Sequence, residues 1–237
     1  MYLNDGEADL YDLLYQDRKD YRAEAELVAR LVRERTADPT SLLDVACGTG
    51  LHLAAFASVF DHVEGVDLAE PMLAVARRRL PGVPLHLADM RDFRLGREFD
   101  ALVCMFSSIG YLRSTVDLDR ALVSMARHLS PGGVLVIEPW YFPENFLDGH
   151  VSGHAFTVGN RTISRVSHST LDGDAARMEI HYVVAEGGVG VHHRSEVDRL
   201  TLFARDDYER AFRQAGLKPE FVGSEGSGPG FFVGVAE

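Results

Sequence analysis

Apolar positions in the first half of the chain alternate between continuous runs and stripes with helical spacing. Residues 7–35 carry leucines and valines three and four positions apart, with charges between them, which predicts a helical N-terminal segment. Apolar runs that follow are separated by further helical stripes, which is typical of a parallel sheet covered on both faces. The runs predict strands at 41–46, 63–67, 83–88, 101–105 and 134–138, and the stripes predict helices at 51–59, 70–79 and 117–129.

The pattern changes after Pro139, where polar and apolar residues alternate as they do in antiparallel strands. Glycine-containing turns join these alternating segments, and a hairpin that resembles the closing strands of the main sheet ends the chain. The expected elements are strands at 161–169, 177–184 and 197–203, a helix at 206–215, and strands at 220–222 and 231–235.

These elements predict an α/β fold of the Rossmann-like kind, with a mostly parallel sheet and a closing antiparallel hairpin. We expect one domain over residues 1–237, with a helical cover at 1–37 and an antiparallel insertion at 140–205 after the fifth strand. An insertion of that length is too long for a simple crossover, so it is the natural place for substrate recognition.

Composition narrows the functional classes. The 237 residues carry a formal net charge of −12, which argues against a nucleic-acid partner because backbone phosphates need clustered Lys and Arg. We find neither a leader-like start nor an apolar run of about 18 residues, so we expect a soluble cytoplasmic protein without a membrane segment. The two cysteines, Cys47 and Cys104, fit a reducing compartment.

The first predicted strand ends in a glycine turn, Cys47–Gly50. Gly48 and Gly50 permit close backbone approach to a ligand, and ligands of such sheets bind beyond the carboxyl ends of the strands. Asp67 ends the second strand 19 residues after Gly48, where its carboxylate can accept hydrogen bonds from ribose hydroxyls. It can equally cap the next helix, and the two roles can coexist.

Two residues after the third strand extend this candidate nucleoside site. Asp89 can accept a hydrogen bond from an adenine amino group, and Met90 can pack on the base. A plain turn-capping role for Asp89 is equally open.

The run Leu42–Gly50 resembles motif I of class I S-adenosylmethionine-dependent methyltransferases, and Leu53 stands where a dinucleotide-binding dehydrogenase more usually has its third glycine. The resemblance implies S-adenosylmethionine as methyl donor and S-adenosylhomocysteine as product. It implies a donor pocket made by Ala46, Gly48, Gly50, Asp67, Asp89, Met90 and Met105.

In such methyltransferases the N-terminal helix covers the donor, so Tyr15, Tyr21 and Arg22 are candidates for contact with its methionine part. Arg22 could pair with the carboxylate, and a tyrosine ring could lie near the sulfonium. A solvated amphipathic face is the alternative for each of them.

The insertion offers candidate acceptor contacts. Arg161 and Arg165 share one strand face, and two guanidiniums in an acidic protein suit a diphosphate, although both could simply pair with nearby carboxylates. The aromatic segment 138–146, with Trp140 and Asn145, could line a base or sugar pocket or form an apolar plug. The histidines form no set with the spacing of metal ligands, so we expect no metal.

Several runs narrow the resemblance to the N,N-dimethyltransferases of nucleotide-linked aminosugars in macrolide antibiotic biosynthesis, of the desosamine type. The runs are Leu42–Gly50, Asp89–Phe93, Met105–Gly110, Glu138–Trp140, Pro143–Phe146, Arg165–His168 and His181–Tyr182.

This narrower resemblance implies two methylations of the 3-amino group of a dTDP-3-amino-3,4,6-trideoxyhexose. Trp140, Asn145, Arg161, Arg165 and His168 would then face the nucleotide sugar, and Tyr111 would orient the amine near the donor methyl. A methyltransferase with another acceptor and a non-catalytic donor-binding regulator are the alternatives. The strand edges of the insertion favour a homodimer.

Overall fold

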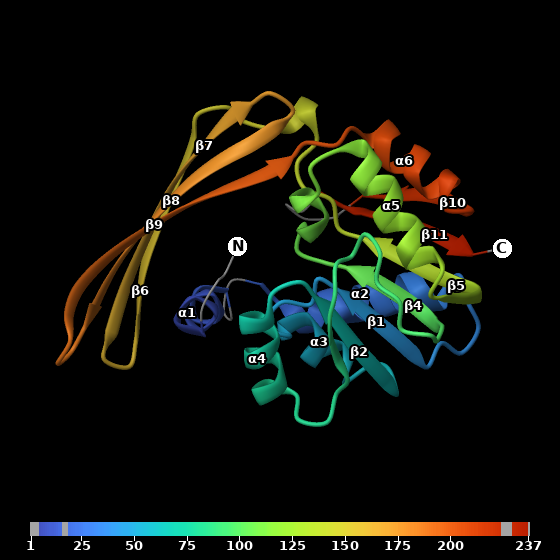
Figure 1. Cartoon of the computed structure of the whole chain (residues 1–237), viewed down its shortest axis with the longest axis horizontal. Coiled ribbons are helices and arrows are strands. Elements are labelled where there is room, and N and C mark those ends of the chain that lie inside the picture. The colour runs from blue at the N-terminus through green and yellow to red at the C-terminus, as the bar shows by residue number, and fades with distance from the viewer. Residues whose placement is uncertain (1–4, 16–18, 224–228, 237) are drawn as a thin grey trace. The chain divides into compact units, whose positions relative to one another are not determined.

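The computed structural model describes residues 5–15, 19–223 and 229–236 of the chain (Figure 1). It divides into two compact units, one formed by Met1–Trp140 with Arg205–Glu237 and the other by Tyr141–Ala204. We expected a single domain with an insertion at 140–205. The insertion forms a compact unit, and within the described residues its strands pair only with one another.

The first unit contains a sheet in which seven of the described strands lie in the order β10-β11-β5-β4-β1-β2-β3. Strands β1 to β5 are parallel, and β10 and β11 form the antiparallel closing hairpin, with β11 next to β5. The strands are β1 (Ser41–Val45), β2 (His62–Asp67), β3 (Leu85–Leu87), β4 (Phe99–Cys104), β5 (Leu129–Ile137), β10 (Leu217–Val222) and β11 (Phe231–Ala236). The predicted α/β fold class is confirmed.

Strand order reverses between β1 and β4, and this reversal defines the place where open α/β sheets bind ligands. Register places Leu42 beside Val63 on β2 and Ala101 on β4. These side chains form one apolar face, against which α2 and α3 pack. The carboxyl ends of β1, β2, β4 and β5 are thereby held at one edge of a rigid sheet.

Local signals explain where the helices begin. The carboxylate of Asp20 accepts from the backbone N–H of Ala23, and the hydroxyl of Ser114 accepts from Asp117, so each caps the first turn of a helix. The predicted N-terminal segment 7–35 is divided into α1 and α2. The helices are α1 (Asp5–Tyr15), α2 (Tyr21–Arg33), α3 (Leu51–Phe56), α4 (Glu70–Arg79), α5 (Thr115–Ala126) and α6 (Arg205–Gln214), with 3-10 turns η1 (Ser108–Tyr111) and η2 (Pro143–Asn145).

The second unit is an antiparallel sheet in the order β6-β7-β8-β9. Its strands are β6 (His150–Val158), β7 (Arg161–Asp172), β8 (Ala175–Glu186) and β9 (Gly190–Thr201). Glycines with positive φ at Gly159, Gly173 and Gly188 form the turns. The sequence pattern did not predict β6, because its mixture of histidine, glycine and small residues hides the alternation that the pairing with β7 reveals.

Candidate active site

The turn after β1 is strained in the way that close backbone approach requires. Ala46, Gly48 and Gly50 all have positive φ, at 62°, 56° and 79°. A Cβ at Gly50 would lie 3.3 Å from the Cβ of Ala76, so α4 packs directly against this glycine. The two glycines therefore adopt the positive φ that the turn requires, and Gly50 also allows α4 to pack closely.

Asp67 joins this turn to the end of β2. Its Oδ2 accepts from the backbone N–H of Gly48 at 2.7 Å, and its Oδ1 accepts from Ala69 at 2.8 Å at the start of α4. Burial raises the pKa of Asp67, while these backbone hydrogen bonds oppose the rise. The capping role considered from the sequence is therefore present, and it also supports the glycine turn.

Asp44 lies beneath the same turn as a buried carboxyl group of β1. It is 1% exposed, and in the described part of the chain neither of its oxygens has a hydrogen-bond partner. Burial, followed by the charge of Asp67, raises the pKa of Asp44 well above its usual range. An unsatisfied buried carboxyl is costly, so its presence here points to a polar ligand in the adjoining site.

Asp89 is held in a local arrangement. Arg91 donates to both carboxylate oxygens of Asp89 through its side chain, at 2.6 Å for the shortest contact, and through its backbone N–H at 2.9 Å. These hydrogen bonds from Arg91 lower the pKa of Asp89. Asp89 therefore stabilises the local turn through Arg91. An adenine contact would use the remaining lone pairs of the ionised carboxylate. Met90 is half-buried beside it.

Helix α1 brings aromatic side chains to the carboxyl ends of the strands. The rings of Tyr11 and Tyr15 lie 4.5 Å apart, and Tyr15 meets Phe106 edge-on at 5.2 Å. Burial raises the pKa of Tyr11 strongly, and the nearby Tyr15, Tyr111 and Asp67 add to that rise. Tyr15 therefore lies where the sequence predicts a donor cover, and Tyr11 joins it one helical turn earlier.

Arg79 anchors this helix to the glycine turn. Its guanidinium donates to the backbone carbonyl of Thr49 and, at 2.5 Å, to the carboxylate of Asp12. One side chain of α4 therefore holds both the turn after β1 and the helix α1. The aromatic cluster is in this way tied to the donor turn.

The other two cover candidates behave differently. The hydroxyl of Tyr21 donates to the carbonyl of Tyr15 at 2.8 Å, and its ring lies edge-on to His52. Arg22 points away: its side chain is 84% exposed and pairs with Glu26 at 3.0 Å. Arg22 therefore lies on the solvent face of α2 and Tyr21 on the inner face, and contact of Arg22 with a donor carboxylate stays a prediction.

The loop after β4 carries Met105 and Tyr111. Met105 is buried in the core, while Tyr111, at the end of η1, is 45% exposed. Phe106 and Ser107 both have positive φ, at 54° and 58°. Glu138 holds the start of this loop by accepting from the N–H of Phe106 at 2.6 Å. The loop therefore presents Tyr111 at the same edge of the sheet as Asp67.

In the second unit, Arg165 is the unusual residue. It is 5% exposed, and in the part of the chain that the structure describes it forms no ion pair. Its guanidinium donates to Ser167 at 3.1 Å and approaches the sulfur of Met178, while Nε has no partner. A buried guanidinium without a carboxylate is a site prepared for an anion.

The other insertion candidates divide between the two faces of β7. Arg161 shares the face of Arg165, as predicted, but it is partly exposed and pairs with Glu186 at 2.9 Å. His168 lies exposed on the opposite face, because it is an odd number of residues from Arg165. Arg161 and Arg165 therefore share one face of β7 and His168 lies on the other, and contact of these side chains with the nucleotide sugar stays a prediction.

Trp140 and Asn145 lie on either side of the boundary between the units. Trp140 is the last residue of its segment of the first unit, and Asn145 belongs to the second. The side chain of Asn145 accepts from the N–H of Phe142 at 2.8 Å, so its oxygen stabilises the local turn of η2. This contact gives Asn145 a structural role.

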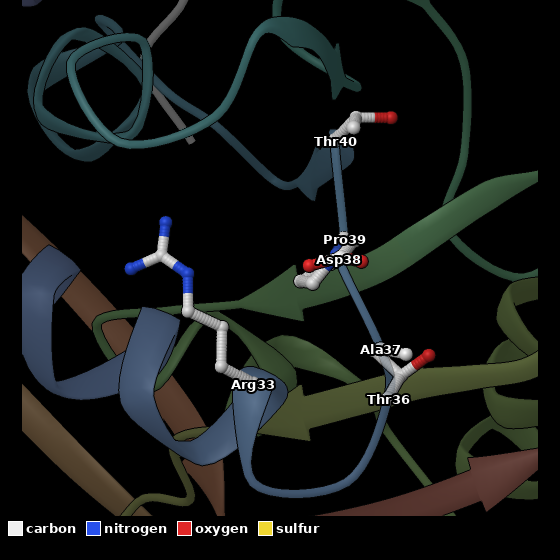
Figure 2. Close-up of a pocket in the computed structure, with 6 residues that line it drawn as sticks. All are labelled: Arg33, Thr36, Ala37, Asp38, Pro39 and Thr40. Atoms are coloured by element: carbon white, nitrogen blue, oxygen red, sulfur yellow. The ribbon is translucent and has the colours of Figure 1, made fainter.

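A hollow at the opposite end of the sheet is not part of this site. Figure 2 shows its lining residues around the chain that enters β1 at its amino end. Ligands of this fold class bind at the carboxyl ends, where Asp44, Asp67 and Tyr111 are found. No helix among the described residues is long and apolar enough to span a membrane, and no described cluster of His, Cys, Asp or Glu could hold a metal. The lining residues are Arg33, Thr36, Ala37, Asp38, Pro39 and Thr40.

Comparisons with known proteins agree with this geometry. A family model described as a methyltransferase domain matches residues 42–133. The dTDP-3-amino-3,4,6-trideoxy-alpha-D-glucopyranose N,N-dimethyltransferase of Streptomyces venezuelae is 55% identical over 96% of this chain and 97% of its own length. A dTDP-3-amino-3,6-dideoxy-alpha-D-glucopyranose N,N-dimethyltransferase of Streptomyces fradiae is 52% identical over 96% of this chain and 90% of its own. The chain belongs to the N,N-dimethyltransferases of dTDP-linked aminosugars.

Solved structures of this family match nearly the whole dimethyltransferase. The crystal structure of Streptomyces venezuelae DesVI superimposes with a TM-score of 0.93 at 55% identity, covering 97% of this chain and 98% of that one. CalS10, an amino pentose methyltransferase from Micromonospora echinaspora solved with bound S-adenosylmethionine, gives a TM-score of 0.89 at 45% identity, covering 96% and 97%.

S-adenosylmethionine is the methyl donor of this dimethyltransferase, and the residues present fit it. The unsatisfied carboxyl of Asp44 supplies a polar contact beside the aromatic cluster of α1, and the open space at Gly48 allows the donor to approach the backbone closely. The second carboxylate, Asp67, lies at the end of β2, where a ribose is bound in this fold class.

Several residues of the dimethyltransferase site were missed from the sequence. Tyr11 could have been found, because it precedes Tyr15 by one helical turn and so shares its face. Glu138 ends a strand at the same edge as Asp67, which is also a readable signal. Lys19 and Asp44 could not have been found in this way. Only the tertiary structure shows that Lys19 pairs with Glu138 and that the buried carboxyl of Asp44 lacks a hydrogen-bond partner among the described residues.

Proposed function

We propose that this dimethyltransferase transfers two methyl groups in succession to the 3-amino group of a dTDP-3-amino-3,4,6-trideoxyhexose, an intermediate of a desosamine-type antibiotic sugar. The buried guanidinium of Arg165 carries this proposal, because a nucleotide diphosphate is the anion that such a sugar brings. The name of the Streptomyces venezuelae relative supports the choice of sugar.

The environment of Arg165 supports a phosphate ligand over a small neutral acceptor. Removing a guanidinium from water without a counter-ion costs several kcal/mol, and within the described residues its hydrogen bonds go to Ser167 and Met178, neither of which is charged. A diphosphate would supply the missing charge and accept from Nε. Arg161 is a weaker candidate for binding the diphosphate, because its guanidinium already pairs with Glu186.

Methyl transfer to an amine depends on alignment. Bound S-adenosylmethionine supplies a methyl group on a positively charged sulfur and is left as S-adenosylhomocysteine. The lone pair of the amine forms the new C–N bond as the electron pair of the C–S bond stays on sulfur, and the amine proton passes to water. We assign to Tyr111, a half-exposed residue at the end of η1, the role of orienting the amine, and positioning of this kind can contribute several kcal/mol.

The decisive experiment is mass spectrometry of the sugar product. Purified protein is incubated with S-adenosylmethionine and dTDP-3-amino-3,4,6-trideoxyglucose, with the matching 3-hydroxy sugar as control. We expect successive gains of one and two methyl groups on the amine only. The dTDP-3-amino-3,6-dideoxy and dTDP-4-amino-2,3,4,6-tetradeoxy sugars, named for two relatives, are run in parallel. Faster dimethylation of either would reassign the acceptor.

We infer further that the protein is a homodimer joined through one face of the second unit. Alternation along β6 to β9 places exposed valines on the face that also carries His168 and His181, and several exposed apolar side chains on one face favour an interface. A second copy is a fitting partner because a two-fold contact buries the same valines on both subunits. These valines are Val151, Val166, Val183, Val191 and Val197.

Light scattering after gel filtration tests this assembly. The wild-type protein is expected at twice the mass of 26.2 kDa. The double variant Val166→Asp and Val183→Asp should run as a monomer, because two charges would be buried on each side of the contact. Val116→Asp, at an exposed valine of α5, should remain dimeric. A monomeric wild-type protein would contradict the assembly.

A further inference from the structure

A chain of polar and charged side chains links the donor turn to the loop after β4. His52, in the first turn of α3, contacts Glu24 of α2 at 2.7 Å between Nε2 and Oε2. The same Oε2 lies 3.0 Å from Nζ of Lys19, and Lys19 reaches the two oxygens of Glu138 at 3.1 and 3.3 Å. The network spans 119 residues of sequence between Lys19 and Glu138.

Glu138 ends this network on a strained piece of backbone. Its Oε2 accepts from the N–H of Phe106 at 2.6 Å, and Ser107 donates through Oγ to the carbonyl of Pro139 at 2.9 Å. Phe106 and Ser107 are both left-handed, which costs non-glycine residues about 1–2 kcal/mol each. The two hydrogen bonds from the end of β5 therefore stabilise a conformation that the loop would not adopt alone.

Lys19 is the counter-ion that this carboxylate requires. Glu138 is 8% exposed, and Lys19 is the cation that the structure's described residues bring to it. Nζ of Lys19 also lies 4.7 Å from the centre of the Phe106 ring, which Tyr15 contacts from α1. The ammonium group therefore contacts both the acid that holds the loop and the aromatic residue that begins it.

We propose that Glu138 is a positioning residue for methyl transfer, and that Lys19 acts through it. The carboxylate sets the left-handed turn at Phe106 and Ser107, and this turn sets where Tyr111 presents its hydroxyl to the acceptor amine. The inference rests on methyl transfer to an amine, and it holds whichever aminosugar is the acceptor.

Steady-state kinetics of four variants test the proposal. Glu138→Gln keeps an oxygen for the N–H of Phe106 but loses the charge that Lys19 meets, and Lys19→Met removes the cation. We expect kcat to fall about 10- to 100-fold in both, with KM for the acceptor little changed, because misplacement by about 1 Å can cost that much. Lys19→Arg should recover most of kcat. Glu220→Gln, which breaks the Arg35–Glu220 ion pair on β10, is the control and should match wild type.

A chemical probe gives a readout that does not depend on activity. Lys19 and Lys218 are the two lysines of the chain, and Lys218 is exposed. Limited acetylation followed by peptide mass spectrometry gives the ratio of modification at Lys19 to that at Lys218. We expect the ratio to rise several-fold in Glu138→Gln, with and without S-adenosylhomocysteine, and to stay at the wild-type value in Glu220→Gln.

The outcomes separate positioning from simple stabilisation. A kcat loss at unchanged melting temperature, with Lys19→Arg active, supports the proposal. Wild-type kcat in both Glu138→Gln and Lys19→Met overturns it, as does a loss that appears only as a lower melting temperature. If Glu138→Gln does not fold, Lys19→Met decides, since wild-type kcat and an unchanged acceptor KM in that variant alone would contradict the role of Lys19.

Discussion

The backbone N–H of Gly48 donates to Oδ2 of Asp67 at 2.7 Å, across 19 residues of sequence. The other oxygen of the same carboxylate accepts from Ala69. One acidic side chain thus joins the glycine turn after β1 to the start of α4. Such preorganisation reduces the ordering that the donor must impose when it binds.

Replacing Asp67 should therefore affect both the turn and the donor. For Asp67→Ala we expect the Kd of S-adenosylhomocysteine to rise about 10- to 100-fold, because a charged acceptor of several hydrogen bonds is lost. Isothermal titration calorimetry measures this directly. Glu70→Gln, at an exposed carboxylate three residues later that pairs with Arg77, is the matched control. Equal affinities in the two variants would remove Asp67 from the donor site.

Replacing Asp44 should stabilise the folded protein but weaken its response to the donor. Burial raises its pKa above the unfolded value, so the ionised form destabilises the folded protein increasingly as pH rises above the usual range of a carboxyl group. At pH 8, Asp44→Asn should raise the melting temperature of the donor-free protein by about 2–4 °C. The extra stabilisation on adding S-adenosylhomocysteine should shrink. A lower melting temperature without donor would contradict this account.

Replacing the two arginines of β7 should change the affinity for dTDP to very different extents. Arg165→Met should weaken dTDP binding about 100-fold, because the variant removes the buried guanidinium that we propose to pair with the diphosphate. Arg161→Met should change dTDP affinity less than about threefold, because Glu186 already pairs with that side chain and exposed ion pairs contribute little. Fluorescence-detected titration with dTDP gives both values. Equal losses would mean that Arg161 leaves Glu186 and joins the ligand.

A buried carboxylate away from the site should govern acid stability. Glu64 of β2 accepts from His62 at 2.8 Å and from His86 at 2.6 Å, and it also pairs with Arg97. Although burial opposes ionisation, the hydrogen bonds from both histidines and the charge of Arg97 hold the pKa of Glu64 below its usual value.

A lowered carboxyl pKa contributes stability that is present above the unfolded pKa and lost as pH falls through the folded one. Glu64→Gln should therefore reduce the free energy of unfolding by about 1–3 kcal/mol at pH 7. The difference from wild type should narrow below about pH 4. Urea unfolding at several pH values measures it, and a constant difference across this range would exclude the ionisation of Glu64 as its cause.

Periodicity along the chain was enough to predict the parallel sheet and its donor turn. The apolar run of 42–45 and the glycines after it are local signals, since a buried strand and a tight turn each depend on a few adjacent residues. The spacing of Asp67 from Gly48 followed from one strand–helix–strand unit. The opposite placements of Arg165 and His168 were also readable, because side chains alternate along a strand.

Only the tertiary structure decided which of these side chains are partnered. The pattern cannot tell that Arg161 meets Glu186 while Arg165 is buried without a carboxylate, because both lie on the same face of one strand. It cannot join Lys19 to Glu138 either, since an ion pair across 119 residues depends on where α2 and β5 are packed. Strand formation and turns are local properties of the chain, whereas burial and charge pairing are set by segments far apart in sequence.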